Sequence, residues 1–414
     1  MINVTGLGKL GYPMANFLAK SRFKINCFDK NKEIKLILKK KKNSYLKFEK
    51  GLIRNNKNLY IYNNHLDSLK NTKISFITVP TPSKKNGQFE IKNILQVLNL
   101  VSVYLKKFYK NKKPYIININ STINPGDIKK FIKFLEQKGL KNKKNFVFLY
   151  NPYFVALGEV YKNLMNPNFI LIGFSETYSK EYLKKIYNQI YKKPKYKFLT
   201  INEAELTKIL LNCYVTTKIS FTNFVDNICN KFKLKDSTKI LDTISTDKRV
   251  GPEYFKKGGP YSGPCFPRDN RALINFCKKI DVDYKIPLAT HNTNKLTVKK
   301  YLQKLNRIKN IKSIGFIGVS YKSNTDCIDE SISIKLMNRA LRKGYKVSYY
   351  DKYTILKNKN YNKIENLKKI INNSDLIFLG YKDKEFKKIN NIKKKIYVWD
   401  PGDLLEKKKN FIFI

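Results

Sequence analysis

The first 150 residues contain short apolar runs separated by longer segments of mixed polarity. The runs at 2–5, 24–28, 73–79, 115–119 and 146–150 have the length and composition of buried β-strands. A helix is expected after the first run, ending at about Lys20. This order predicts an α/β domain with an open parallel sheet, which binds ligands at the carboxyl ends of its strands.

From residue 201 the pattern becomes helical. Residues 202–232 predict one long helix, and its broad apolar arc is expected to pack against a symmetry mate as well as its own domains. Strand patterns resume after residue 312 and predict a second, smaller α/β unit. The remaining predicted elements are helices at 271–280, 283–304 and 331–342 and strands at 313–318, 346–350, 375–380 and 396–399. We therefore predict three domains, at 1–200, 201–305 and 306–414.

A glycine-rich turn follows the first predicted strand. It contains Gly6, Gly8 and Gly11 in a Gly-x-Gly-x-x-Gly arrangement, and the second strand ends at Asp29. Glycines at this spacing allow a pyrophosphate to approach a helix N-terminus closely. An acid in this place accepts hydrogen bonds from the adenosine ribose and favours NAD over a 2′-phosphorylated cofactor. A glycine turn in another kind of α/β protein is the alternative, but the order of elements favours a Rossmann-type NAD domain.

A second glycine- and proline-rich turn, residues 258–267, contains Cys265 just before a predicted helix, with Asp269 four residues later. Amide dipoles at a helix N-terminus favour an anion, which lowers the pKa of a thiol and makes it a nucleophile. A structural thiol in a tight turn is an equally good interpretation from these residues alone.

Polar residues at other positions also suggest a ligand site. Thr81, Thr122 and Asn151 lie at or just beyond the ends of three predicted strands, which suggests a shared cleft, although each could cap a helix. Lys208 and Asn212 are four residues apart and share one face of the long helix. Local pattern favours a solvated position for both side chains over one that points into a cleft.

The formal net charge of +53 raises the possibility of a nucleic-acid partner. However, only eight of the 84 cationic residues are arginine, the better fork for bases and phosphates, and lysines occur in nearly every segment. We therefore interpret most of the charge as compositional drift and expect no specific nucleic-acid binding.

Other features of composition indicate where the protein acts. No apolar run is long enough to span a membrane, and the chain enters a strand pattern without a leader, so we expect a cytoplasmic protein. The six cysteines lack paired metal-ligand spacing and there are two histidines, so no metal site is expected.

Six motifs occur in the order found in nucleotide-sugar 6-dehydrogenases, and the chain resembles this UDP-glucose/GDP-mannose dehydrogenase family over nearly its whole length. The resemblance rests on the glycine turn, the Cys265 turn, Val79-Pro80-Thr81-Pro82, Ser121-Thr122-Ile123-Asn124-Pro125-Gly126, the segment Ala204-Glu205-x-x-Lys208-x-x-x-Asn212 with Lys218-Ile219-Ser220-Phe221-x-Asn223, and Tyr321-Lys322-x-x-Thr325.

The resemblance implies an N-terminal NAD domain, a central helical dimerisation region and a C-terminal domain that completes the nucleotide site. It implies a homodimer that oxidises the C6 hydroxymethyl group of a UDP-sugar to a carboxylate with two NAD, for polysaccharide synthesis. UDP-glucose is the expected substrate and UDP-glucuronate the expected product. In such a reaction a thiolate captures the intermediate aldehyde and the resulting thioester is hydrolysed.

The resemblance also assigns roles to particular residues. Cys265 is the expected nucleophile, Lys208 and Asn212 stabilise the oxyanion, and Asp269 and Thr122 position or activate water. The expected cofactor-binding residues are Gly6, Gly8, Leu10, Gly11, Asp29, Thr81, Thr122 and Arg268. The expected substrate-binding residues are Phe154, Lys208, Asn212, Arg249 (which reaches the sugar of the neighbouring subunit), Tyr254, Gly259 and Lys322.

Two segments depart from the family pattern. Where the family has Asn-Pro-Glu-Phe-Leu-x-Glu-Gly, this chain has Tyr153 and Leu157 in place of the glutamates. A tyrosine of ordinary pKa cannot act as a base at neutral pH, so Asp269 with water, or Glu159, must take over, or hydrolysis is slow. The arginine of the Asp-x-Arg-Glu-Ser pattern is also absent, from Cys327-Ile328-Asp329-Glu330-Ser331.

Several alternatives stay open at this level. The sugar could be UDP-N-acetylmannosamine instead of UDP-glucose. The opening segment also resembles 3-hydroxyacid dehydrogenases, which transfer one hydride and need no cysteine. The loss of both glutamates is compatible with a degenerate protein that binds nucleotide sugars without catalysis.

Overall fold

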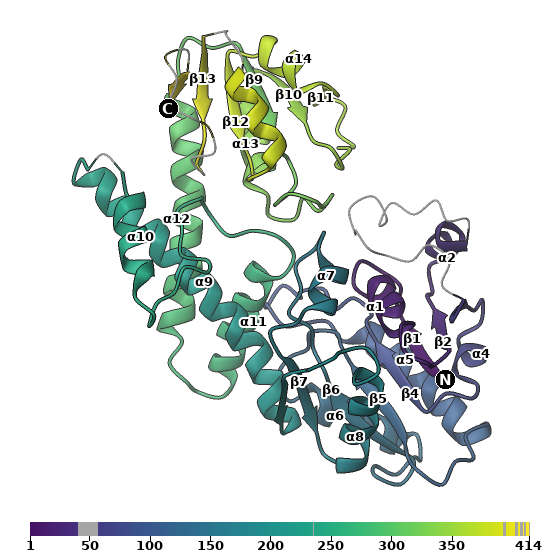
Figure 1. Cartoon of the computed structure of the whole chain (residues 1–414). Coiled ribbons are helices and arrows are strands. Elements are labelled where there is room, and N and C mark those ends of the chain that lie inside the picture. The colour runs from purple at the N-terminus through teal and green to yellow at the C-terminus, as the bar shows by residue number, and fades with distance from the viewer. Residues whose placement is uncertain are drawn as a thin grey trace. The chain divides into compact units, whose positions relative to one another are not determined.

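The computed structural model describes residues 1–39, 57–234, 236–391, 395–401, 405, 409 and 411–413. It divides into two compact units, Met1–Leu210 and Leu211–Ile414, and each unit has its own sheet (Figure 1). The predicted α/β class, the long helix and the second, smaller sheet are confirmed. Within the described residues, no helix combines the length and apolar character needed to cross a membrane.

The sheet of the first unit has eight strands in the order β3-β2-β1-β4-β5-β6-β7-β8. Neighbouring strands are parallel except for β6 and β7, which pair antiparallel, a departure from the expected all-parallel sheet. The order reverses at β1, which creates the switch point where such sheets bind ligands. The strands are β1 (Ile2–Thr5), β2 (Ile25–Phe28), β3 (Leu59–Ile61), β4 (Ile74–Ile77), β5 (Tyr115–Ile119), β6 (Phe146–Tyr150), β7 (Ile170–Phe174) and β8 (Tyr196–Leu199).

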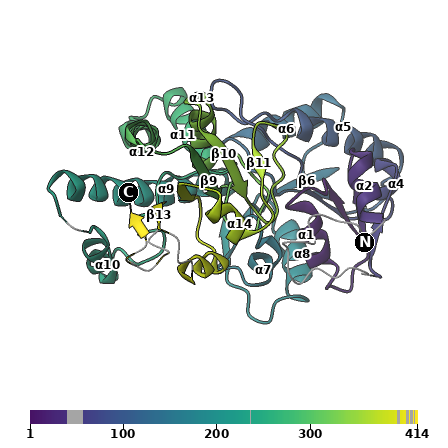
Figure 2. The ribbon, with the colours of Figure 1, turned by 90° about the horizontal axis from the view of Figure 1, so that it is seen from above.

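Helices bury both faces of this sheet, because its strands are apolar on both sides. Figure 2 shows α1 and α8 on one side of the strands and α5 and α6 on the other. The first face is covered by α1 (Gly11–Leu18), α7 (Val160–Met165) and α8 (Thr177–Tyr187), and the second by α4 (His65–Leu69), α5 (Lys92–Lys107) and α6 (Asp127–Gln137). A further helix, α2 (Lys32–Lys39), follows β2.

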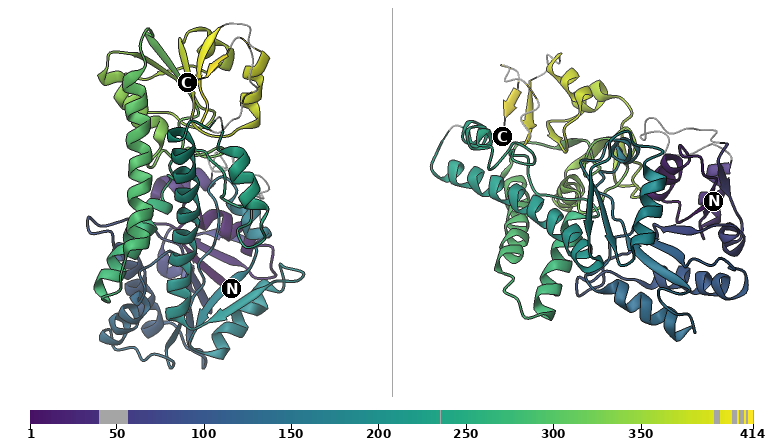
Figure 3. Two further views of the ribbon diagram at one scale, coloured as in Figure 1. Left: turned by 90° about the vertical axis from the view of Figure 1, so that its left-hand side faces the viewer. Right: turned by 60° about the horizontal axis from the view of Figure 1, so that its bottom comes forward.

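The long helix α9 (Ile201–Lys231) begins in the first unit and continues into the second. In the second unit it packs against α12 (Lys285–Arg307), where the Thr217 and Thr290 hydroxyl oxygens are 3.0 Å apart and the Ser220 hydroxyl donates to the Thr290 carbonyl. The left view of Figure 3 shows the two helices side by side. The other helices of this region are α10 (Thr238–Thr246) and α11 (Phe266–Lys279).

The second unit ends in a six-stranded parallel sheet in the order β11-β10-β9-β12-β13-β14. One face packs against α12 and α13 (Ile332–Arg342), and the other against α14 (Leu367–Asn372) and the short helix η1 (Lys384–Asn391). The strands are β9 (Ser313–Ile317), β10 (Lys346–Tyr350), β11 (Asn362–Lys363), β12 (Leu376–Leu379), β13 (Ile396–Trp399) and β14 (Phe411–Phe413).

Candidate active site

The glycine turn between β1 and α1 is a tight loop that closes on its own backbone. Gly6 has a φ of +96°, and its carbonyl accepts a hydrogen bond of 2.7 Å from the Thr78 hydroxyl at the end of β4. A Cβ on Gly11 would lie 1.7 Å from the Gly6 carbonyl oxygen, which no side chain tolerates. Positions 6 and 11 are therefore glycine because the turn itself requires it.

Gly8 and Leu10 lie at the N-terminus of α1, where Gly8 faces open space and Leu10 packs against the core. A Cβ on Gly8 would have no atom within 4 Å, and Leu10 is the residue that precedes the first turn of α1. The first backbone N–H groups of a helix have no partner within the helix and favour a negative charge. Open space at Gly8 beside these N–H groups fits the pyrophosphate of NAD.

Asp29, at the end of β2, holds this loop in place. One carboxylate oxygen accepts a 2.6 Å hydrogen bond from the Leu7 N–H and the other a 2.8 Å hydrogen bond from the Asn31 N–H. Asp29 is buried, so these bonds are well shielded from water. The carboxylate thus supports the glycine turn in addition to its predicted contact with the ribose.

Two of the three predicted polar strand ends come together, and the third does not face a cleft. The Thr81 hydroxyl donates a 2.7 Å hydrogen bond to the Thr122 carbonyl, which links the segments after β4 and β5. Asn151 is 1% exposed, and its amide bonds to the Leu171 carbonyl and the Tyr187 hydroxyl. The expectation of a cleft shared by all three is therefore wrong for Asn151, which holds β6, β7 and α8 together.

Lys208 lies inside the first unit instead of on a solvated face. The residue is only 6% exposed, and its ammonium group donates a 2.8 Å hydrogen bond to the Tyr153 carbonyl. The same ammonium lies 4.4 Å from the centre of the Phe154 ring, a cation–π contact. Two predicted site residues, Lys208 and Phe154, are thus neighbours.

The Tyr153 carbonyl binds Lys208, but the Tyr153 side chain packs in the core against α8. Its hydroxyl lies 2.5 Å from the Tyr187 hydroxyl, and burial raises the pKa of Tyr153 well above its ordinary value. A phenol with a raised pKa stays protonated at neutral pH. Tyr153 is therefore excluded as a general base.

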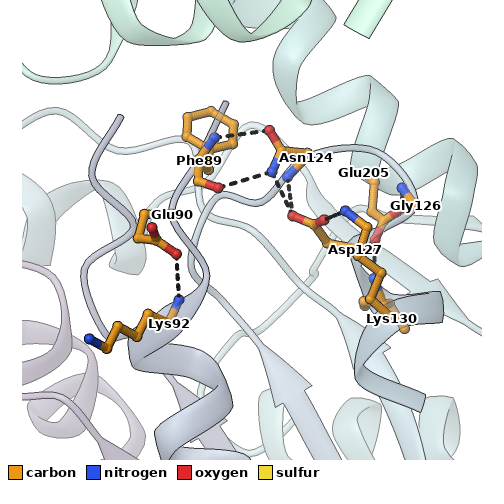
Figure 4. Close-up of polar contacts among 9 residues, drawn as sticks. Phe89, Glu90, Lys92, Asn124, Gly126, Asp127, Lys130 and Glu205 are labelled. Atoms are coloured by element: carbon orange, nitrogen blue, oxygen red, sulfur yellow. Dashed lines mark hydrogen bonds and ion pairs between the residues drawn. The ribbon is translucent and has the colours of Figure 1, made fainter. Parts of the chain in front are cut away.

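Glu205, one turn before Lys208, fixes the start of α9 to the N-terminus of α6 (Figure 4). Its carboxylate is fully buried and accepts hydrogen bonds from the Gly126 N–H at 2.6 Å and the Ile128 N–H at 3.0 Å. Nearby, the Asp127 carboxylate accepts a hydrogen bond from the Asn124 side chain and pairs with Lys130. Glu205 thus orients the segment of α9 that carries Lys208.

Burial raises the pKa of Glu205 to about 7, although the two N–H donors oppose this shift. Because the folded state holds this proton more tightly than the unfolded chain, raising the pH from 4.5 through 7 removes stability, up to about 3 kcal/mol. The neutral variant Glu205→Gln lacks this dependence. We expect the melting temperature of the wild type relative to Glu205→Gln to fall between pH 5 and pH 8.

The control for this measurement is Glu203→Gln, on the same helix. Hydrogen bonds from Thr200 lower the pKa of Glu203, so it is ionised throughout this pH range and its variant should show a constant difference from the wild type. A constant difference for Glu205→Gln as well would contradict the raised pKa.

In the second unit, Cys265 is solvent-exposed and directly precedes α11. The helix begins at Phe266, earlier than the sequence predicts, with Pro267 in its first turn. Proline there removes no hydrogen bond, because the first N–H groups of a helix have no acceptor within it. The thiol is thus accessible and lies where amide dipoles favour a thiolate, and its role as the nucleophile stays a prediction.

Asp269, one turn after Cys265, is fully buried and charge-paired. It accepts a 2.6 Å hydrogen bond from the Asn212 side chain on α9 and a 3.2 Å one from the Arg268 guanidinium. Asn212 is itself 9% exposed, so it faces this cluster and not solvent. Three predicted site residues therefore form one hydrogen-bonded group beside the cysteine turn.

The remaining predicted residues of this unit lie in different surroundings. The Tyr254 ring is edge-on to Phe266, with 6.2 Å between ring centres, and is therefore close to the cysteine turn that contains Gly259. The Arg249 side chain is 89% exposed and pairs only with Asp247, two residues away, among the contacts described. Lys322 follows β9, on the loop before α13. Their binding roles stay predictions.

Thr78 and Glu205 contribute to the site although neither was expected to. Glu205 belongs to a motif that the sequence displays, but a carboxylate's partner 79 residues away cannot be found from spacing. For Thr78, the only clue in the sequence is a hydroxyl residue at the end of an apolar strand, where ligand sites of such sheets lie. Within the described residues, no cluster of His, Cys, Asp or Glu could hold a metal ion.

A largely parallel sheet with a glycine turn at its switch point and an acid after β2, together with an exposed cysteine before a helix, defines an NAD-dependent oxidoreductase. The chain belongs to the UDP-glucose/GDP-mannose dehydrogenase family. Residues 1–191 match its NAD-binding domain, residues 202–296 its central domain and residues 315–406 its UDP-binding domain.

Known relatives agree with this assignment. The chain is 30% identical over 318 residues to UDP-glucose 6-dehydrogenase of Rickettsia bellii, which covers 76% of this chain and 69% of the relative. It is 28% identical over 341 residues to GDP-mannose 6-dehydrogenase of Pseudomonas putida, covering 77% and 75%. A UDP-glucose dehydrogenase structure from Pyrobaculum islandicum has the same fold, with a TM-score of 0.89, 21% identity and coverage of 100% and 96%.

Proposed function

We propose that this protein oxidises the C6 hydroxymethyl group of UDP-glucose to the carboxylate of UDP-glucuronate. The observation that carries the proposal is the exposed Cys265 before α11, with the buried Asp269–Asn212 pair one turn away. A dehydrogenase that stops at an aldehyde needs no such nucleophile. The names of the rickettsial relatives support UDP-glucose as the substrate.

The chemistry assigned to the chain has three stages. The alcohol loses a proton and a hydride to become an aldehyde, and the Cys265 thiolate adds to the aldehyde carbon. The thiohemiacetal then loses a second hydride and becomes a thioester, which water cleaves to the carboxylate and the free thiol. NAD, when bound, accepts one hydride in each oxidation. Lys208 is assigned to the oxygen that becomes negative when the thiolate adds.

Asp269 is assigned to the water that cleaves the thioester, with Thr122 to position it. Tyr153 cannot take this role because its hydroxyl is buried against Tyr187. Glu159 is half-exposed and forms an ion pair of 3.3 Å with Lys162, which leaves it a surface residue at the start of α7. The Asn212 amide holds the Asp269 carboxylate in a fixed orientation, as a water-activating group requires.

The nucleotide half of the substrate is assigned to the second unit. Residues 315–406 match the family's UDP-binding domain and include most of the second sheet. Lys322 lies in this segment, on the loop after β9. Asp351, at the end of β10, accepts hydrogen bonds from the Val319 and Ser320 N–H groups and so shapes this loop. Lys322 is assigned a contact with the substrate through its charge, Tyr254 a place at the nucleotide, and Gly259 a further contact with the substrate.

The protein is proposed to act as a homodimer through one face of α9. In the single chain Tyr214, Phe221, Phe224 and Ile228 are 64%, 47%, 52% and 48% exposed. Their spacings of seven, three and four residues place them on one stripe of the helix, as in the seam between paired helices. A second copy presents the same stripe, so a two-fold interface would cover both.

Two charged substitutions test this interface. Phe221→Glu with Phe224→Glu is expected to shift the protein from dimer to monomer, because two carboxylates would be buried without partners. The measurement is molar mass by light scattering during size exclusion. Phe108→Glu, at an aromatic residue of similar exposure outside α9, is the control and should leave the mass unchanged. A dimer that survives the double substitution rules out this face.

The function itself is tested by incubating the purified protein with NAD and UDP-glucose, UDP-N-acetylmannosamine or GDP-mannose in separate reactions. The proposal expects two NADH per UDP-glucuronate, identified by mass. One NADH per product would instead indicate a single-hydride dehydrogenase. Binding of UDP-sugars without NADH would indicate a non-catalytic binder, and acid from another nucleotide sugar would overturn the choice of UDP-glucose.

A further inference from the structure

The loop that leads to Cys265 is held at alternate residues by three different elements. The Gly259 carbonyl accepts a 2.9 Å hydrogen bond from the Asn223 side chain of α9. The Tyr261 backbone forms hydrogen bonds with the Asn294 side chain of α12. The Gly263 N–H donates a 2.9 Å hydrogen bond to the carbonyl of Asp329, on the loop after β9. A loop rich in glycine and proline is therefore fixed from outside, although it has no regular structure of its own.

The contact at Tyr261 differs from the other two because one side chain binds both backbone groups. The Tyr261 N–H donates 2.8 Å to the Asn294 Oδ1, and the Asn294 Nδ2 donates 3.0 Å to the Tyr261 carbonyl. Both residues are buried: Tyr261 is 5% exposed and Asn294 is 9% exposed. An amide side chain is the neutral group that offers a donor and an acceptor side by side. It therefore fixes both the position and the orientation of the Tyr261 backbone.

Only three residues separate Tyr261 from the cysteine. Pro264 has a fixed φ, and Gly263 is confined between the Asp329 carbonyl and the Tyr321 ring, which lies where a Gly263 side chain would be. The backbone that carries the thiol is therefore anchored at Tyr261 and again at Gly263.

We propose that Asn294 is a positioning residue for Cys265. It is assigned no contact with substrate or cofactor, and it acts by holding the loop so that the thiol stays at the α11 N-terminus and in line with the reacting carbon. The proposal rests on the proposed function for its effect on turnover, but not for its effect on the loop.

Asn294→Ala should leave two buried backbone groups unpaired and loosen the loop. The kcat for acid formation is expected to fall roughly 10- to 100-fold, with the KM values for UDP-glucose and NAD changed less than about threefold. Hydrogen exchange at the backbone N–H groups of residues 261, 262, 263 and 265 should become faster. Alkylation of Cys265 by iodoacetamide, followed by mass spectrometry without substrate, should shift its pH profile upward as the thiol leaves the helix N-terminus.

Asn292→Ala, on the exposed side of the same helix, is the matched control and should change none of these quantities. Asn294→Gln keeps the donor and the acceptor and should recover part of the kcat; it also serves if the alanine variant does not fold. Wild-type kcat and unchanged exchange in a folded Asn294 variant would overturn the proposal. If exchange and alkylation change in the Asn294 variants while Cys265→Ser remains active, Asn294 positions the loop but the covalent mechanism of the proposed function is wrong.

Discussion

Cys265→Ser is expected to abolish formation of the acid, with kcat at least about 10³-fold below that of the wild type. A serine hydroxyl is not ionised at neutral pH, even at a helix N-terminus, so it does not trap the aldehyde as a thiolate does. The position of Cys265 matters as much as its chemistry, because the exposed thiol precedes α11, where backbone N–H groups stabilise negative charge. The measurement is product mass and NADH yield with UDP-glucose.

The matched control is Cys277→Ser. Cys277 lies near the other end of α11 and is partly exposed, and burial raises its pKa, which makes it a poor nucleophile. This variant should retain wild-type turnover, and both variants should retain the wild-type melting temperature. Acid formation by Cys265→Ser at the wild-type rate would exclude the thioester route.

Gly8→Ala and Gly11→Ala are expected to abolish NAD binding by different physical routes. The added methyl of Gly11→Ala would lie 1.7 Å from the Gly6 carbonyl oxygen, so the turn itself must open and the melting temperature must fall. The methyl of Gly8→Ala has no atom within 4 Å, so the fold persists while the methyl occupies the space assigned to the pyrophosphate. We expect affinity for NAD to fall at least about 100-fold in both variants.

Calorimetric titration with NAD and thermal melting separate the two routes. Gly8→Ala should melt like the wild type and fail to bind, which shows that the loss is local. If Gly8→Ala binds NAD with wild-type affinity, the pyrophosphate does not lie against Gly8. If Gly11→Ala melts like the wild type, the loop has an alternative conformation that the present hydrogen bonds do not suggest.

The strands that sequence predicts most accurately are those with buried side chains on both faces. The apolar runs 2–5, 115–119 and 146–150 coincide with β1, β5 and β6, whose residues are all buried. β3 and β8 lie at the edges of their sheet and have exposed or half-exposed side chains, so an apolar run does not reveal them. β7 is also absent from the predicted strands, although its residues are apolar, and residue pattern does not specify its antiparallel direction.

For the site, sequence predicts which residues carry chemistry better than what holds them. The spacing of the glycines and the turn around Cys265 are local signals, and their conformations agree with them. Local pattern favoured solvated positions for Lys208 and Asn212, but both are buried by contacts with residues 55 and 57 positions away. Glu205 binds Gly126 and Asn294 binds Tyr261, and only the fold brings each residue to its distant partner.

The two hydrogen bonds made by Asp29 bear on any attempt to redesign cofactor preference. Exchanging an acid at the end of the second strand for a small neutral residue is the direct way to admit a 2′-phosphate. Here the same carboxylate restrains the Leu7 N–H in the glycine turn and the Asn31 N–H before α2. A switch to NADP therefore requires a second substitution that replaces these two hydrogen bonds. Without it, the redesigned enzyme is expected to bind both NAD and NADP weakly.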